Sequence, residues 1–304
     1  MAVSLSQIKS ELLPGLFDVR GSYDMIPRQW DKVFTTHKSN MALERSSQMR
    51  FLGLPQLKAE GGATAFDNNA GERWVFNFEH QEVALGYAIT RKAIDDNLYK
   101  AQFNPTNLKL QESFSQFKEI QGANILNTAT TYNAAIGGDG QALLSAAHPY
   151  DGGTWANTPS VQVDLSESTL LQGMINVRTG FYNEAGLRIL SRARRLVVPA
   201  ALEPQAIRLT KTELRPGTAN NDVNAILTTS GGLPEGYIVL DFLTSNYSWF
   251  LTTNIDGLVH MLRMPFEMDM QVDFVTDNLL VKGYERYSFG YNDPRAIYGS
   301  TPSS

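Results

Sequence analysis

The sequence predicts an α+β fold, and two segments carry that prediction. From residue 266 to residue 274, apolar and polar side chains alternate strictly, the pattern of a strand with one buried and one exposed face. The apolar members are Phe266, Met268, Met270, Val272 and Phe274. A helix is predicted over residues 107–132, where apolar residues recur at helical spacing at Leu110, Phe114, Phe117 and Ile120. Helices and strands follow one another without a regular β-α-β order, which favours α+β.

Composition excludes several classes of protein. The chain has 304 residues and a net charge of −5, whereas a dedicated nucleic-acid-binding protein is more often basic. Cysteine is absent, so disulfides, thiolate metal sites and cysteine nucleophiles are excluded. The four histidines form no H-x-x-x-H pair, so we expect no zinc site. The first residues lack a signal-peptide pattern and no apolar run approaches the ~20 residues that span a bilayer, so we expect a soluble protein without a membrane partner.

The N-terminal 35 residues hold more apolar side chains than an exposed segment can carry. Residues 3–13 predict a short amphipathic helix, which Pro14-Gly15 ends. Residues 15–35 show no periodicity, yet they contain many large apolar side chains, among them Phe17, Tyr23, Met25, Ile26, Trp30 and Phe34. These side chains need burial, either against neighbouring subunits or against the chain's own domain.

A long hairpin is predicted around a flexible tip at residues 60–72, which is rich in Gly, Asn and Asp. The segments RWVFNFEHQ and VALGYAI follow the tip, and QMRFLGLPQLK precedes it. An isolated two-stranded hairpin is marginal in water, so its aromatic face must lie against its own domain or another subunit.

Shorter elements fill the rest of the chain. Further helices are expected at 91–99, at 166–182 with Ser166 as the N-cap, and at 200–209 after Pro199. Strands are expected at 196–198, 237–240, 249–253 and 257–261, and loops at 137–140 and 215–224.

No catalytic motif is found. The glycine-rich run at 137–140 lacks the strand and helix of a phosphate-binding loop and predicts a turn, and no G-x-S-x-G elbow occurs. His148 is interpreted as a loop histidine bonded to backbone. The carboxylates Asp95 and Asp96, and the row Glu267, Asp269 and Asp273, are more consistent with solvated faces than with a cation site. The basic cluster Arg188, Arg192, Arg194 and Arg195 is expected to pair with carboxylates within or between subunits, although it could touch nucleic acid.

Together these segments resemble the major capsid proteins of tailed bacteriophages with the Hong Kong 97 fold, and within them the Mu-like major head subunit group. The resemblance is carried by residues 138–158, 194–209, 215–226 and 274–300, with the FLGLP turn at 51–55. It implies an N-arm at 1–35, an E-loop at 53–86, an A-domain at 137–262 and a P-domain in three parts. Those parts are 36–52, 87–136 with a spine helix at 107–132, and a C-terminal hairpin at 263–304.

The resemblance also implies a function. Such a chain assembles into pentamers and hexamers of an icosahedral shell that encloses double-stranded DNA without reading its sequence, in a virion built in the host bacterial cytoplasm. Implied partners are further copies of the chain, a separate scaffolding protein, a portal and a decoration protein. No catalytic residue, cofactor or metal is implied, and Lys58 lies at the base of the E-loop, where it does not support a covalent crosslink. The residues expected at subunit contacts are Trp30, Phe34, Phe66, Trp74, Phe76, Phe78, Arg192, Arg194 and Arg195.

Two alternatives remain open on the sequence. An encapsulin-type bacterial compartment would have the same fold but a protein cargo. A soluble enzyme would be a monomer with a deep pocket of convergent carboxylates.

Overall fold

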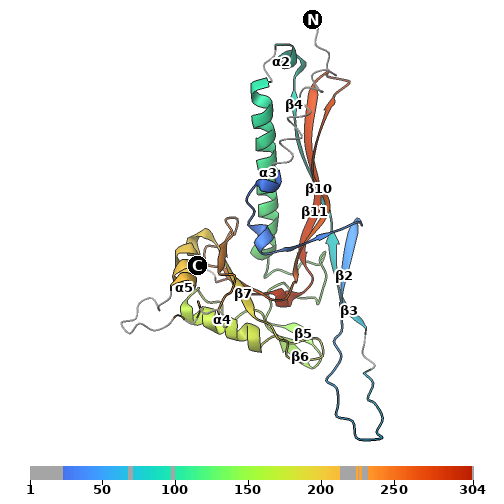
Figure 1. Ribbon diagram of the computed structural model, residues 1–304, viewed down its shortest axis with the longest axis vertical. Coiled ribbons are helices and arrows are strands. Elements are labelled where there is room, and N and C mark those ends of the chain that lie inside the picture. Colours follow the sequence, from blue (N-terminus) through green and yellow to red (C-terminus); the bar gives the residue numbers. More distant parts are fainter. Residues whose placement is uncertain are drawn as a thin grey trace.

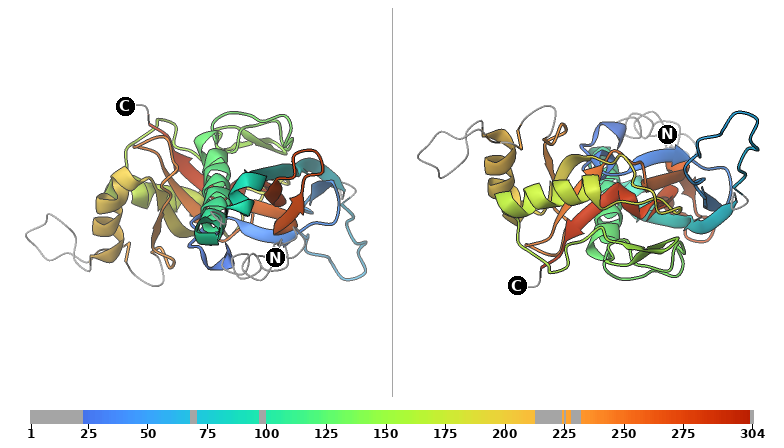
Figure 2. Two further views of the ribbon diagram at one scale, coloured as in Figure 1. Left: turned by 90° about the horizontal axis from the view of Figure 1, so that it is seen from above. Right: turned by 90° about the horizontal axis from the view of Figure 1, so that it is seen from below.

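The computed structural model describes residues 23–67, 71–96, 100–212, 224, 226–227 and 232–302. The helix expected at 3–13 lies outside the described residues, and so does the loop expected at 215–224 except for Asn224. The described chain is elongated: one helix and a set of long strands run along it, and a second sheet with its helices lies at one end (Figure 1). Viewed down the long axis, the helix α3 lies at the centre, with α4 and α5 on one side of it (Figure 2).

A four-stranded sheet forms the long part of the molecule. Its order is β1-β10-β11-β4; β1 runs parallel to β10 and the other pairs are antiparallel. The strands are β1 (Thr35–Lys38), β4 (Gln81–Ile89), β10 (Leu258–Val272) and β11 (Leu279–Tyr291). The predicted alternation is confirmed in β10, where Phe266, Met268 and Met270 are buried and Asp269 and Gln271 are exposed. Phe274 was expected on the buried side, which is wrong because β10 ends at Val272 and Phe274 lies in the turn beyond it.

The helix α3 (Lys100–Asn127) covers one face of this sheet. It begins seven residues before the predicted start, because Pro105 lies in the second turn, where its missing N–H removes a single helical hydrogen bond. It ends at Asn127, whose side chain bonds the backbone of Phe242 and Thr244 instead of continuing the helix. The short helix α2 (Arg91–Asp95) precedes it, with Thr90 as its N-cap.

A buried ion pair joins α3 to the sheet. Lys118 of α3 binds Glu285 of β11, and both side chains are almost fully buried. Burial raises the pKa of the Glu285 carboxyl, and the Lys118 ammonium opposes that rise. The hydroxyl of Tyr23 donates a hydrogen bond to the same carboxylate at 3.3 Å. The ammonium also lies 4.6 Å from the ring centre of Tyr287, a cation–π distance.

The second sheet has the order β12-β9-β7-β8. Its strands are β7 (Ala193–Val198), β8 (Tyr237–Val239), β9 (Trp249–Thr253) and β12 (Ile297–Ser300). The helices α4 (Glu167–Thr179) and α5 (Glu203–Lys211) pack on it, and Ser166 caps α4 as predicted, accepting from the Thr169 N–H at 3.2 Å. Short 3-10 helices occur at Tyr23–Met25, Trp30–Lys32, Ala200–Leu202 and Pro294–Ala296, and a small hairpin joins β5 (His148–Tyr150) to β6 (Gly153–Trp155).

Two boundaries between the expected domains do not match the way in which the strands pair. The C-terminal residues 297–300 were placed with the long hairpin, but β12 pairs with β9 in the second sheet. The strand predicted at 257–261 was assigned to residues 137–262, but it is the start of β10, and Leu258 pairs with Tyr291 of β11 in the long sheet. The apolar pattern of a strand does not tell which sheet the strand joins.

The strands of the predicted long hairpin pair differently from the prediction. Strand β2 (Leu43–Met49) pairs with β3 (Glu72–Glu79), and residues 50–71 form the β2–β3 loop. The segment 81–89, assigned in part to the E-loop, is β4 and pairs with β11 instead. Only His80 separates β3 from β4, and both strands carry the same apolar alternation, so the change of partner leaves no signal in the pattern.

One buried histidine couples the sheet to the N-terminal segment. The His260 ring centre lies 4.4 Å from that of Trp30 and 4.6 Å from that of Phe289. Its Nδ1 lies 3.2 Å from the Thr36 hydroxyl, and its Nε2 has no hydrogen-bond partner among the described residues. Burial, together with the cationic side chains of Lys118 and Arg28, lowers the pKa of His260 to about 3.

Acid is therefore expected to destabilise the subunit through His260. Its native pKa lies below the ordinary value of 6.5, so the stabilisation is complete above pH 6.5 and is lost as pH falls toward 3. Between pH 7 and pH 5 this one group removes about 2 kcal/mol from the free energy of unfolding. Urea unfolding of dissociated subunits at pH 7 and pH 5 measures this loss of unfolding free energy. The loss should be about 2 kcal/mol smaller in His260→Leu than in the unmodified chain. Substitution of the exposed His37 gives the control, and an equal loss in His260→Leu and the unmodified chain would contradict the prediction.

Candidate assembly interface

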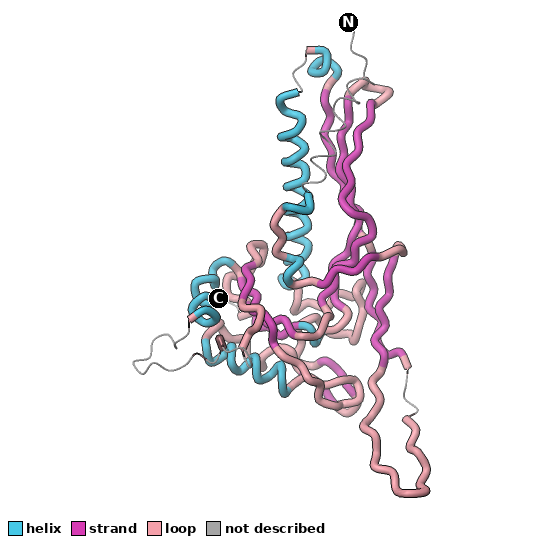
Figure 3. The backbone as a smooth tube through the Cα atoms, viewed as in Figure 1, coloured by secondary structure: helices cyan, strands magenta, loops and turns pink. Residues whose placement is uncertain are grey.

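The β2–β3 loop presents a row of large apolar side chains to solvent. Its described residues carry no strand or helix and extend beyond the β2–β3 stem (Figure 3). Five side chains in it are more than half exposed: Phe51, Leu52, Leu54, Leu57 and Phe66. Contiguous exposed apolar surface of this kind marks an interaction site in a stable protein. Of these five, only Phe66 was among the predicted contact residues. The run FLGLPQL could have identified the others, because it is apolar without the alternation of a strand.

The stem of this loop is anchored, although the loop is not. Arg50 and Arg73, one on each side of the loop, both bind the carboxylate of Asp151 in the β5–β6 turn. Arg73 also donates to the Glu184 carbonyl at 3.0 Å. The Gln48 side chain donates to the carbonyl of Asn292 at 2.7 Å. These contacts hold the base of the loop against the β5–β6 hairpin and the end of β11, and they leave the apolar residues of the loop in solvent.

Four of the predicted contact aromatics lie in the subunit's own core. Trp30, Phe34, Phe76 and Phe78 are at most 4% exposed, so their own subunit buries these side chains that were expected at contacts with neighbours. The segment before Trp30 is fixed by Glu119 of α3, whose carboxylate accepts the N–H groups of Gln29 and Trp30 at 2.7 and 3.0 Å. A side chain already enclosed by its own subunit has no surface left for a second one.

Glycine makes the close packing of Phe76 possible. Gly138 has a φ of +94° and lies against the Phe76 ring; a Cβ there would lie 2.3 Å from a ring carbon. Gly137 and Gly140 also have positive φ, so the prediction of a turn at 137–140 is confirmed. Trp74 is half-buried beneath the Arg73 guanidinium, 4.5 Å from its ring centre, and Phe66 is 85% exposed. Of the predicted aromatics, Phe66 is therefore the one that offers a free surface.

Two arginines of the cluster are paired with a carboxylate and two are not assigned such a pair. Arg194 and Arg195 both bind Glu235, and Arg195 also donates to the Lys32 carbonyl, so the expected pairing with carboxylates is confirmed within the subunit. Arg188 and Arg192 are exposed.

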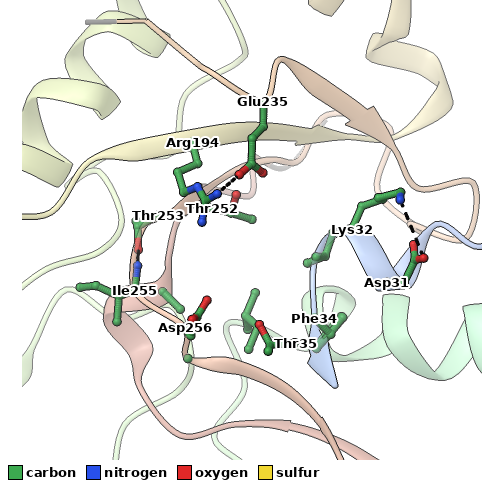
Figure 4. A pocket seen from close by; sticks show the side chains of 14 residues that line it. Asp31, Lys32, Phe34, Thr35, Arg194, Glu235, Thr252, Thr253, Ile255 and Asp256 are labelled. Carbon is green, nitrogen blue, oxygen red and sulfur yellow. Dashed lines mark hydrogen bonds and ion pairs between the residues drawn. The ribbon is translucent and has the colours of Figure 1, made fainter. Parts of the chain in front are cut away.

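A polar cavity of about 110 Å³ lies between the two sheets, and Arg194 and Glu235 face the Asp31–Thr35 segment across it (Figure 4). It has room for a few water molecules only. Within the residues that the structure describes, no group of three His, Asp or Glu side chains could hold a metal ion.

His148 is buried and has side-chain partners instead of the expected backbone ones. Its Nδ1 lies 2.6 Å from the carboxylate of Asp139, and its ring stacks on Trp155 with ring centres 4.5 Å apart. The loop at 137–140 is therefore tied to the β5–β6 hairpin. Among the described helices, none is long and apolar enough to cross a membrane.

Comparison with known protein families identifies the family of the chain. The sequence matches the phage capsid protein family over residues 79–300. The chain belongs to this family. It is a shell-forming capsid protein, and its α+β architecture is the Hong Kong 97 fold. Membership of the Mu-like group stays a prediction, and no curated protein matches the sequence.

Solved capsid structures share the fold at low sequence identity. The procapsid of bacteriophage JBD30 matches at 13% identity with a TM-score of 0.52, covering 99% of this chain and 77% of that one. The empty GTA particle matches at 11% identity with a TM-score of 0.56, over 91% and 90% of the two chains. A virus-like particle from Pyrococcus furiosus matches at 10% identity with a TM-score of 0.53, over 95% and 99%.

Removing the shared carboxylate should loosen the stem without unfolding the subunit. In Asp151→Ala, Arg50 and Arg73 lose their common partner, and because these pairs are partly solvated each is worth less than about 1 kcal/mol. Hydrogen exchange in β2 and β3 should become faster, while the free energy of unfolding changes little. Glu112→Ala removes an exposed carboxylate on α3 and serves as the control. Unchanged exchange in β2 and β3 would show that Asp151 does not anchor the stem.

Proposed function

We propose that this chain is the major capsid protein of a tailed phage and forms pentamers and hexamers of a closed icosahedral shell around double-stranded DNA. The observation that carries the proposal is the β2–β3 loop, with its anchored stem and solvent-exposed apolar residues. Burying one such side chain is worth about 1.5–3 kcal/mol, so five of them provide a strong drive to association. Permanent interfaces of this kind exceed roughly 2,000 Å².

Pentamers and hexamers require one chain to tolerate two sets of neighbours. Ring contacts are head-to-tail, and the same surfaces must meet at different rotations in a five-membered and a six-membered ring. A loop that is held at its base by Arg50 and Arg73 and exposes its apolar residues can adjust to both. We assign this loop the role of the E-loop, the long sheet with α3 that of the P-domain, and the second sheet that of the A-domain.

The remaining partners follow from the same proposal. We propose a separate scaffolding protein and a portal as partners of the growing shell, and a decoration protein as a partner on its outer surface. The virion is the final location, after assembly in the host bacterial cytoplasm. Residues 1–22 complete the N-arm in this assignment and lie outside the described residues.

A compartment shell with a protein cargo is the second candidate. The likeness to the virus-like particle from Pyrococcus furiosus favours it, since it covers nearly the whole of both chains. The content of purified particles separates the two functions: nuclease-protected DNA indicates a phage head, and a co-purifying enzyme indicates a compartment.

Polar substitution in the loop should abolish assembly and leave the subunit folded. In Leu57→Ser/Phe66→Ser, two exposed side chains lose their apolar surface, and the free energy of unfolding should change by less than about 0.5 kcal/mol. Electron microscopy should show closed shells for the unmodified chain and none for the double variant. The pair Leu57→Met/Phe66→Leu keeps the apolar surface and should assemble. Normal shells from the serine variant would remove the loop from the interface, and no shells from the unmodified chain would overturn the proposed function.

The free subunit should bind DNA weakly and without sequence preference. The chain is acidic, and the described basic side chains are scattered or, like Arg194 and Arg195, already bound to carboxylates. Phosphate contacts from such residues are salt-sensitive and carry no base information. Fluorescence anisotropy at physiological salt, with random and phage-derived duplexes, should give equal and weak binding. Nanomolar, sequence-selective binding would identify a regulatory protein instead.

A further inference from the structure

The chain contains three Asp-Gly sequences, at residues 139–140, 151–152 and 256–257. At such a sequence the glycine amide nitrogen can attack the side-chain carboxyl carbon of the aspartate and close a succinimide ring. Glycine favours this reaction, because it has no Cβ to hinder the approach and its backbone rotates freely. The reaction therefore depends on how firmly the fold holds the carboxyl group and the glycine at each of the three places.

Two of the three Asp-Gly sequences are held by their surroundings. The Asp139 side chain is only 4% exposed, and one of its oxygens lies 2.6 Å from Nδ1 of His148. Gly257 is buried, and a Cβ added to it would lie 2.3 Å from the carbonyl oxygen of Asp293. The Gly257 amide therefore has no room to move toward the Asp256 carboxyl group.

The third sequence lies in an open turn. Tyr150 of β5 pairs with Gly153 of β6, so Asp151 and Gly152 are the two residues of the turn between them. Both turn residues are exposed. Gly152 has a φ of +96° and open space where a Cβ would lie. This turn has the room to rotate that the other two Asp-Gly sequences lack.

The Asp151 carboxylate is also the group that anchors the stem of the β2–β3 loop. Arg73 binds its Oδ1 at 2.9 Å and Arg50 binds its Oδ2. Ring closure requires one carboxyl oxygen to leave as water, so that oxygen must first take up a proton. A guanidinium stays charged and binds a carboxylate in its ionised form, so the two arginines oppose the reaction. The pairs are partly exposed and each is weak, which allows them to open.

We propose that Asp151 is a site of spontaneous modification to isoaspartate and that its two arginine partners control the rate. In the first step the bond from the Gly152 nitrogen to Asp151 Cγ forms and a Cγ–O bond breaks. The amide proton leaves with the hydroxyl group as water. Water then opens the ring: cleavage at Cγ restores aspartate, and cleavage at the main-chain carbonyl carbon gives isoaspartate. One water is released and one is taken up, so the mass of the chain does not change.

The modification would release the stem of the β2–β3 loop. In isoaspartate the chain continues through the side-chain carbon, which adds a methylene group to the backbone and leaves the free carboxylate directly on Cα. That carboxylate cannot keep its position between Arg50 and Arg73 while β5 and β6 remain paired. The inference concerns a single subunit, so its outcome does not depend on assembly or on the proposed function.

Ageing of the purified, unassembled chain at neutral pH tests the site. Isoaspartate is measured by methyl transfer from S-adenosylmethionine with protein isoaspartyl methyltransferase, and mass spectrometry of the digested chain locates it. Isoaspartate at residue 151 should exceed that at residues 139 and 256 at least tenfold. Equal amounts at the three positions, or none at residue 151, would overturn the proposal.

Removal of one arginine tests the control of the rate. In Arg50→Gln, one oxygen of Asp151 loses its cationic partner, and isoaspartate should form at least threefold faster at residue 151 and at an unchanged rate at residue 256. Arg45→Gln, at an exposed arginine of β2, gives the control and should age like the unmodified chain. An unchanged rate in Arg50→Gln would show that the arginines do not protect the carboxylate.

Hydrogen exchange tests the consequence for the stem. Exchange in β2 and β3 should become faster in the aged chain, and repair with the methyltransferase and S-adenosylmethionine should restore the original rate. Asp151→Glu keeps a carboxylate but would need a larger ring, so its exchange should not change with age. Faster exchange that repair does not reverse, or equal ageing of Asp151→Glu, would contradict a release through isoaspartate.

Discussion

The packing of α3 on the β10–β11 ribbon is the interaction on which the rest of the molecule depends. Strands of 15 and 13 residues joined by one turn form a ribbon that is marginal in water until a face is covered. Phe114 provides much of that cover, since it packs against Phe266 and fits over Gly283, where a Cβ would lie 2.8 Å from its ring. The Lys118–Glu285 pair adds a geometric constraint, because removing either partner would leave a buried charge without compensation. Helix and ribbon are thereby held in one register, and Tyr23 joins the N-terminal segment to the same carboxylate.

The aromatic side chains of the subunit fall into a buried set and an exposed set. Trp30, Phe34, Phe76 and Phe78 close the core where the two sheets meet, so their burial is complete within one subunit. Phe66 and the leucines of the β2–β3 loop make no comparable contact with the part of the subunit that the structure describes. A chain with this division can fold as a stable subunit and still associate strongly, since association does not require the core to open.

The local elements could be predicted from the sequence, but their partners could not. The alternation in β10, the cap at Ser166 and the turn at 137–140 depend on residues close in the chain, and all three were found. The change of partner at His80 and the return of residues 297–300 to the second sheet depend on contacts with residues far away in sequence. The aromatic residues at subunit contacts could not be predicted for the same reason. An aromatic face that must be buried looks the same in sequence whether its own subunit or a neighbour covers it. Exposure, which only the fold defines, separates Phe66 from Phe76.

The base of the β2–β3 loop connects its direction to the arrangement of the two sheets. Arg50 and Arg73 bind Asp151 beside the second sheet, whereas β3 passes through His80 directly into β4 of the long sheet. The His80 ring is itself fixed between the hydroxyls of Ser39, at 2.7 Å, and Ser288, at 3.2 Å. A change in the angle between the sheets must therefore turn the stem, and the loop beyond the stem turns with it. The direction of the loop is in this way coupled to the internal geometry of the subunit that carries it.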